Sequence, residues 1–339
     1  MFKEDKGEGP NKRLLPHFVQ NIEWLRLSCL CAFLFLSGIY APIIGIAMTL
    51  ASSVPISLIG IRQGVYKAFL AVLFVAALMF LPFGEAGSVS FILGAGFLGI
   101  IFGIMVKKTS SAGEAIFGLI IAVLISKLIF MWFMIYTKGF NPFALDESSV
   151  NALMRSLNSS HVSDDTLKTV IRQINLLTPS FLIMASGLDV YVNYVLVSKL
   201  EYRRLKTAAS PSVNVNYADE KVNELRVPPL PPFDQWSFPR SLLSAFLAAF
   251  LIALFDVPDT SIILISAEIN LKVLTSVMFF IQGLSFAWWW MLHRSFSFRA
   301  RLLIIILLML VPILPMGLIM VGILDIVINI REKIRRNNK

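Results

Sequence analysis

The sequence contains few of the residues on which metal proteins and disulfide-bonded proteins depend. It has 339 residues, of which two are cysteines and three are histidines. Cys29 and Cys31 are two positions apart, so on a helix they point to different faces and indicate neither a disulfide nor a metal site. His17, His161 and His293 form no H-E-x-x-H motif. We therefore expect no metal centre and no bound cofactor.

Motifs for catalysis and nucleotide binding are also missing. The chain has no G-x-S-x-G nucleophile elbow, no P-loop and no G-x-G-x-x-G after an expected strand. Gly94 and Gly96 lie in an apolar stretch that is expected to cross a membrane, which excludes a nucleotide loop there. The sequence therefore predicts a protein that is not an enzyme.

Charged residues make up only 15% of the chain, whereas 57% of its residues are hydrophobic and the mean hydropathy is +0.76. Soluble domains are about 45–50% apolar and lack apolar runs of about twenty residues. Such runs recur here from end to end, and each predicts a membrane-spanning helix. The period-two alternation of a membrane barrel is absent. The sequence therefore predicts an all-α, polytopic helical membrane protein that contacts the lipid bilayer.

The net charge of +9 raises the question of nucleic-acid binding. Lys and Arg, however, fall in short clusters between the apolar segments, which is the pattern of the positive-inside rule. We interpret these clusters as topology determinants and expect no nucleic-acid partner. Their distribution predicts that both termini lie on the cytoplasmic side of a bacterial inner membrane.

The order of polar and apolar segments predicts separate regions and about eight to ten transmembrane helices. The regions are a polar cytoplasmic tail (1–21), a six-helix membrane unit (22–200), a cytoplasmic proline-rich linker (201–240), C-terminal membrane helices (241–330) and a basic cytoplasmic tail (331–339). No cleavage site follows the first span, which we expect to remain as an anchor.

Glycine and proline mark the expected breaks and contacts between spans. Residues 82–87 predict a turn between the third and fourth spans. In the fourth span, Gly99 and Gly103 form a G-x-x-x-G pair, which predicts close packing with another helix. Residues 302–330 are long for one crossing and short for two, so we expect a bend at Pro312–Pro315.

Residues 137–175 form a polar stretch that contains two amphipathic patterns. Apolar residues recur there at helical spacing, first at Val150, Leu153, Met154 and Leu157 and then at Leu167, Val170, Ile171 and Ile174. Ser163 and Asp164 offer a helix start before the second pattern. We expect two short helices on the outer side, which lie on the membrane face or cover a cavity.

Ionisable residues inside the expected spans are the main candidates for a binding site. Lys127 lies near the middle of the fifth span and Asp189 near the middle of the sixth. A charge in the bilayer is unfavourable unless it is paired or hydrated, so we expect these two to form an ion pair. Asn193 and Tyr194 follow about one turn later and would add polar groups and an aromatic surface for a solute. The alternative is an ion pair that only neutralises itself.

Glu268, Asn270 and Lys272 form a second candidate binding set, in the eighth span. The two charged residues are four positions apart, in the order that favours pairing on one helix face. They would bind a substrate or neutralise one another, and Glu268 or Asp189 would carry protons in a self-sufficient secondary transporter. Asp325 lies near the end of the last span, where we expect an interfacial position.

A proline-rich segment, Val227–Arg240, separates the two large apolar blocks and is called the joint below. It cannot continue a helix, because proline lacks an N–H and clashes with the preceding turn. An extended, polyproline-like shape suits partner binding because it loses little entropy. The candidate docking residues are Pro228, Pro229, Pro231, Pro232, Phe233 and Trp236.

Several of these segments resemble the YybS-like family of uncharacterised multi-pass bacterial membrane proteins, and the resemblance spans residues 22–336. It is carried by Ala41-Pro42, Pro55–Gly64, Pro231–Pro239, Ile281–Leu284 and Gly322–Arg331. The joint and the closing Gly-x-Leu-Asp … Arg pattern are its more specific parts.

The first six spans are also distantly similar to the substrate-binding S-components of energy-coupling factor transporters. Those six-helix proteins bind vitamins or metal ions and dock onto a coupling subunit that works with two ATPases. Their docking helices show A-x-x-x-A, whereas the small residues here are Ser28 and Ala32, and Ala41 and Gly45. The helices after Arg240 have no counterpart in an S-component.

Two functions follow as hypotheses. In the first, the protein recognises or transports a small polar solute in the manner of an S-component, with a coupling subunit and its ATPases as partners. In the second, it is a membrane scaffold without transport activity that recruits cell-envelope or division proteins through the joint.

Overall fold

The computed structural model describes residues 11–41, 44–145, 150, 164–208, 227–254, 262–311 and 313–337. This part of the chain consists of helices and short connections and contains no β-strand. Six of its helical stretches are long and apolar enough to cross a membrane, and a bent pair of helices would make a seventh. The predicted all-α, polytopic membrane fold is confirmed.

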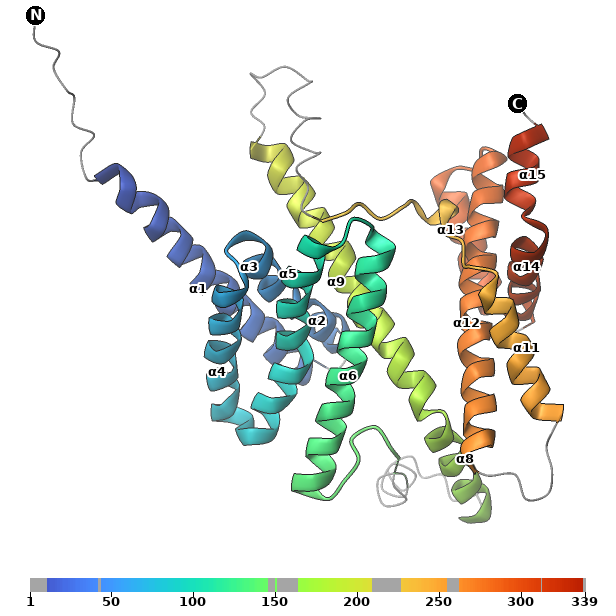
Figure 1. The fold of residues 1–339 in the computed structure, drawn as a ribbon, viewed down its shortest axis with the longest axis horizontal. Helices are drawn as coiled ribbons and strands as arrows, with labels where there is room; N and C mark the ends of the chain where they lie inside the picture. Colours follow the sequence, from blue (N-terminus) through green and yellow to red (C-terminus); the bar gives the residue numbers. More distant parts are fainter. Residues whose placement is uncertain are drawn as a thin grey trace, which may run out of the picture. The chain divides into compact units, whose positions relative to one another are not determined.

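The chain divides into two compact units (Figure 1). Unit 1 comprises Met1–Pro142 and Ala185–Leu230, and unit 2 comprises Phe143–Met184 and Pro231–Lys339. The chain passes between the units three times, and the last of these boundaries falls inside the joint, between Leu230 and Pro231.

Unit 1 is a bundle of membrane-length helices and shorter helical pieces. It contains α1 (Asn11–Tyr40), α2 (Gly45–Ala51), α3 (Val54–Arg62), α4 (Val65–Phe91), the π-helical turn η1 (Ile92–Gly96), α5 (Phe97–Lys108), α6 (Ala112–Lys138) and most of α9 (Thr178–Ala208). An N-cap bond from the Glu114 N–H to the Ser111 hydroxyl begins α6, and the left-handed Gly139 ends it.

The chain reverses direction between the start of α4 and the end of α5, although the helices follow one another without a loop. Gly84 has φ 62° and ψ −153°, which is not helical. The Ser88 hydroxyl donates a 2.8 Å hydrogen bond to the Ala76 carbonyl, although twelve residues of straight helix would span about 18 Å. The chain in Figure 1 accordingly runs along α4, turns and returns through α5. The turn predicted at residues 82–87 is confirmed.

Helices α3 and α5 approach each other closely at glycine. A Cβ atom on Gly103 would lie 2.9 Å from the Cα of Gly60, and one on Gly99 would lie 2.5 Å from the Cβ of Ile56. Only hydrogen at these positions lets the two backbones come so near. The packing role predicted for the G-x-x-x-G pair is confirmed.

Unit 2 holds the C-terminal helices and the region that precedes the sixth predicted span. It contains α8 (Asp164–Leu176), the start of α9, the short helix η2 (Phe233–Gln235), α11 (Ser241–Leu254), α12 (Ile262–His293), α13 (Phe298–Leu310), α14 (Leu314–Ile328) and α15 (Ile330–Asn337). Helix α11 covers the predicted seventh span but has 14 residues, fewer than the roughly 20 of a typical crossing.

The expected bend in the last apolar block is present. The chain bends by 112° between α13 and α14. Pro312 itself lies outside the described residues. By length and apolar composition the described residues give six spans, or seven with the bent pair. Two of the predicted crossings, the third and fourth, lie within one of these stretches, Val65–Lys108, which turns back at Gly84.

Two predicted features fall wholly or partly outside the described residues. The second amphipathic helix of the 137–175 region is confirmed as α8. Of the first, expected at residues 150–157, only Val150 is described, and residues 209–226 of the linker are not described either.

Candidate functional site

The predicted ion pair inside unit 1 is present. The Lys127 ammonium on α6 lies 2.7 Å from an Asp189 carboxylate oxygen on α9. Both side chains are mostly covered, with exposed fractions of 17% and 30%. Each residue is within a few positions of the centre of its span, Ala112–Lys138 or Thr178–Lys206. The pairing is therefore confirmed, and its part in solute binding stays a prediction.

Asn193 is fully buried, and its side chain forms hydrogen bonds with two serines of unit 1. Its side-chain amide donates to the Ser53 hydroxyl at 2.5 Å, and its carbonyl oxygen accepts from the Ser57 hydroxyl at 3.1 Å. These bonds fasten α9 to the first turn of α3. The donor and the acceptor of the Asn193 side chain are therefore both satisfied, and this residue links α9 to α3.

Tyr194 is also fully buried, and it reaches the joint. Its hydroxyl donates a 2.6 Å hydrogen bond to the Pro228 carbonyl, and its ring packs against Phe102 at 5.5 Å between centroids. A proline-rich segment has few backbone N–H groups that can donate hydrogen bonds. A side chain that donates to one of its carbonyls therefore holds the segment in place. The sequence indicated Tyr194 as a pocket residue, whereas the structure shows it anchoring the start of the joint.

Glu268 and Lys272 form the expected pair on α12, with 3.1 Å between ammonium and carboxylate. The lysine side chain is 52% exposed, so the pair lies at the edge of unit 2. The side chain of Asn270, between them in sequence, forms hydrogen bonds with backbone groups. It accepts from the Ser180 N–H at 2.8 Å and donates to the Leu176 carbonyl at 2.7 Å. It thereby satisfies backbone groups at the end of α8 and the start of α9.

Some of the candidate docking residues of the joint are exposed, and others are packed against α12. Pro229, Pro231 and Pro232 are exposed. Phe233 and Trp236 pack edge to face at 5.3 Å, and their backbone carbonyls both accept from the Ser285 hydroxyl, at 2.7 and 3.0 Å. The two aromatic residues therefore fasten the joint to α12.

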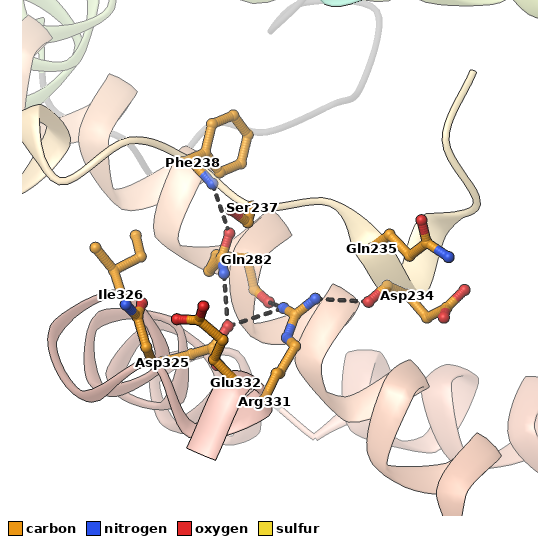
Figure 2. Close-up of a pocket in the computed structure, with 10 residues that line it drawn as sticks. Asp234, Gln235, Ser237, Phe238, Gln282, Asp325, Ile326, Arg331 and Glu332 are labelled. Atoms are coloured by element: carbon orange, nitrogen blue, oxygen red, sulfur yellow. Dashed lines mark hydrogen bonds and ion pairs between the residues drawn. The ribbon is translucent and has the colours of Figure 1, made fainter. Parts of the chain in front are cut away.

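A polar cluster in unit 2 joins three segments, and sequence reasoning did not identify it as a site (Figure 2). Asp325 on α14 accepts from the Gln282 amide at 2.6 Å and pairs with Arg331 at 2.9 Å. Gln282 in turn accepts from the Phe238 N–H at 3.0 Å. Arg331 also donates to the Asp234 carbonyl at 2.7 Å. The cluster therefore holds the joint, α12 and the α14–α15 turn together.

Asp325 lies near the end of α14, where the sequence placed it. The structure adds that its carboxylate is enclosed by Gln282 and Arg331, with the residue only 4% exposed. The available signal was the resemblance itself: Pro231–Pro239, Ile281–Leu284 and Gly322–Arg331 are three of the segments that carry it, and the cluster unites them.

A cavity of about 400 Å³ opens beside this cluster. Its lining is mostly polar and consists of Asp234, Gln235, Ser237, Phe238, Gln282, Asp325, Ile326, Asn329, Arg331 and Glu332. The size falls in the range of small-molecule sites. Among the described residues, however, no three His, Cys, Asp or Glu side chains are arranged to hold a metal ion.

The chain matches known sequences along most of its length. The family described as predicted membrane protein (DUF2232) matches residues 29–217 and 220–326. The protein called Uncharacterized protein YybS, of Bacillus subtilis (strain 168), is 22% identical over 318 residues, which is 91% of this chain and 96% of the relative. No solved structure matches significantly. The chain therefore belongs to the DUF2232 family of predicted membrane proteins, and the YybS-like resemblance inferred from its sequence is confirmed.

Proposed function

We propose that this protein is a non-enzymatic component of a bacterial cell membrane that recognises or transports a small polar solute, and that the solute engages the Lys127–Asp189 pair. The observation that carries the proposal is the location of this pair: two opposite charges 2.7 Å apart near the middle of two membrane-length helices. An ionisable residue at such a depth marks a functional site more often than a structural one.

The energetics favour a role beyond neutralisation. Each charge at the bilayer centre is unfavourable by about 2.5–3.5 kcal/mol on insertion scales. Replacing a buried ion pair with apolar residues of similar volume is often neutral or stabilising. An ion pair with a purely structural role would therefore stabilise the protein little more than two leucines at the same positions would. A site that exchanges its internal partner for a charged or polar solute needs both charges.

The helices that carry the pair also approach each other at a glycine. Gly187 lies two residues before Asp189 on α9, and an added Cβ there would sit 3.9 Å from the Ile120 side chain of α6, an ordinary contact. In a protein that works in the manner expected of an S-component, energy would come from a coupling subunit with ATPases.

A ligand panel tests the proposal. Thermal unfolding of the purified full-length protein is followed with thiamine, riboflavin, biotin, adenine, uracil, Co²⁺ and Ni²⁺. We expect one class of compound to raise Tm of the wild type but not of the Lys127→Met/Asp189→Leu double variant, which keeps the packing and lacks the charges. An equal rise in both proteins, or no rise with any compound, would contradict the proposal.

A second candidate function, the scaffold, is favoured by one observation. Pro231 and Pro232 are exposed while the backbone that follows them is held by Ser285 on α12. A pre-ordered proline strip binds partners with little loss of entropy. Affinity purification of a Pro231→Ala/Pro232→Ala variant tests it: loss of co-purifying envelope proteins would support the scaffold, and unchanged recovery would exclude it.

A further inference from the structure

The π-helical turn η1 lies between α4 and α5 in unit 1, and it changes which backbone groups are bonded to each other. The Phe97 N–H bonds to the carbonyls of Ile92 and Gly94. In an α-helix the same N–H would bond to the Leu93 carbonyl, four residues back. The turn therefore leaves the Leu93 carbonyl without its usual backbone donor, inside the membrane-length stretch Val65–Lys108. Single π-helical turns of this kind are often found at functional sites.

A serine of α6 supplies one donor to that carbonyl. The Ser126 hydroxyl lies 2.5 Å from the Leu93 carbonyl oxygen, and the serine is only 1% exposed. A freed backbone group inside a membrane needs such a partner, because lipid offers none. A carbonyl oxygen has two lone pairs, so it can accept a second hydrogen bond. The next residue of α6 is Lys127, whose ammonium pairs with Asp189. Adjacent residues of one helix therefore contact the backbone acceptor and form the ion pair.

Gly94, next to the freed carbonyl, leaves one side of the turn uncovered. The residue is exposed, and an added Cβ would meet nothing within 4 Å among the described residues. Gly96 is different, since its Cβ would lie 2.8 Å from a methyl group of Val72. Packing therefore explains Gly96 and does not explain Gly94, although glycine is less favourable than alanine in a helix. A glycine without a packing role allows a ligand to approach the backbone closely.

We propose that the Leu93 carbonyl is part of the solute site, and that the solute is an organic molecule that donates an N–H or O–H hydrogen bond to it. This inference rests on the proposed function, in which the solute engages Lys127 and Asp189. Backbone carbonyls are among the few polar groups that orient ligands in mostly apolar sites. A bare metal cation fits poorly, because the Lys127 ammonium would repel it. Among the described residues, moreover, no three His, Cys, Asp or Glu side chains are arranged to hold one.

Access of water to Gly94 tests this site. Gly94→Cys is made in a chain with Cys29→Ala and Cys31→Ala and is treated in proteoliposomes with a membrane-impermeant methanethiosulfonate. Ile125→Cys is the matched control, because Ile125 precedes Ser126 on α6 and is 50% exposed on the apolar surface. We expect Gly94→Cys to be labelled about tenfold faster than Ile125→Cys or more, since the reactive thiolate forms only where water reaches the thiol.

The panel of compounds named above gives a second readout on the full-length protein. We expect one of its organic compounds to raise Tm of the wild type and of Gly113→Leu, but not of Gly94→Leu, whose side chain covers the open side of the turn. Gly113 is the matched control because an added Cβ there also meets nothing within 4 Å among the described residues. A rise with Co²⁺ or Ni²⁺ alone, or an equal rise in the two leucine variants, would overturn the inference.

Failure of this inference differs from failure of the proposed function. Slow labelling of Gly94→Cys together with fast labelling of Asp189→Cys would remove the turn from the site and leave the ion pair as the solute site. Fast labelling of Gly94→Cys with slow labelling of Asp189→Cys would separate the turn from the pair and overturn the inference as well. Slow labelling at both positions would contradict the inference and the proposed function together.

Discussion

Arg331 and Asp325 form a 2.9 Å ion pair across the junction of α14 and α15, with side chains that are 12% and 4% exposed. Asn329 between them is left-handed, with φ 52°, and ends α14. That turn returns the Arg331 side chain toward the helix it follows. The same guanidinium donates to the Asp234 and Trp236 carbonyls, so one buried pair fixes both the end of the helix and the joint.

Breaking this pair should destabilise unit 2 strongly. Removing one partner leaves a buried charge without compensation, which costs about 3–5 kcal/mol. We therefore expect Arg331→Met and Asp325→Leu each to lower Tm markedly, and the double variant to lower it by less than the sum. Thermal unfolding in detergent measures the effect, with Lys333→Gln as an exposed control. Strict additivity of the two single variants would mean that the residues do not interact.

Glycines on α14 should respond to alanine in opposite directions. A Cβ on Gly322 would collide with the Phe279 carbonyl of α12, whereas one on Gly317 would meet nothing within 4 Å. Overpacking costs about 1–3 kcal/mol. Helix propensity alone favours alanine over glycine by up to about 1 kcal/mol. We expect Gly322→Ala to lower Tm and Gly317→Ala to leave it unchanged or raise it. Equal behaviour would contradict the observed α12–α14 packing.

The start of the joint should loosen when Tyr194 loses its hydroxyl. Tyr194→Phe removes the 2.6 Å bond to the Pro228 carbonyl and keeps the ring against Phe102. A hydrogen bond of this kind contributes about 0.5–1.5 kcal/mol net. We expect faster trypsin cleavage after Arg226, next to the joint, at nearly unchanged Tm. Tyr202→Phe, an exposed tyrosine on the same helix, is the control and should leave the cleavage rate unaltered.

Features governed by local chemistry could be predicted from the sequence. Gly84 turns the chain where a glycine and proline cluster indicated a break, and Gly103 packs against Gly60 as its motif indicated. The Lys127–Asp189 pair also followed from sequence, because two charges of opposite sign at equal depth in consecutive spans have few other partners.

Features governed by distant partners could not be predicted. Asn193 and Tyr194 are polar residues in a span, and nothing near them in sequence shows that Ser53, Ser57 and Pro228 satisfy them. The enclosure of Asp325 could not be predicted either, because its partner Gln282 is 43 residues away. Its other partner, Arg331, returns only through the left-handed turn at Asn329.

Access of water to the mid-span pair is the most direct test of the proposed solute site. A solute path must be open to water, whereas a purely structural pair is sealed by helices and lipid. Asp189→Cys is made in a chain with Cys29→Ala and Cys31→Ala and is treated with a membrane-impermeant methanethiosulfonate in proteoliposomes. Leu188→Cys is the matched control, since Leu188 is the adjacent residue and is 51% exposed on the apolar surface.

We expect Asp189→Cys to be labelled about tenfold faster than Leu188→Cys or more, because ionised thiol forms only where water reaches it. Labelling of Asp189→Cys as slow as that of Leu188→Cys would show that the pair is sealed, and it would contradict the assignment of Lys127 and Asp189 to a solute site.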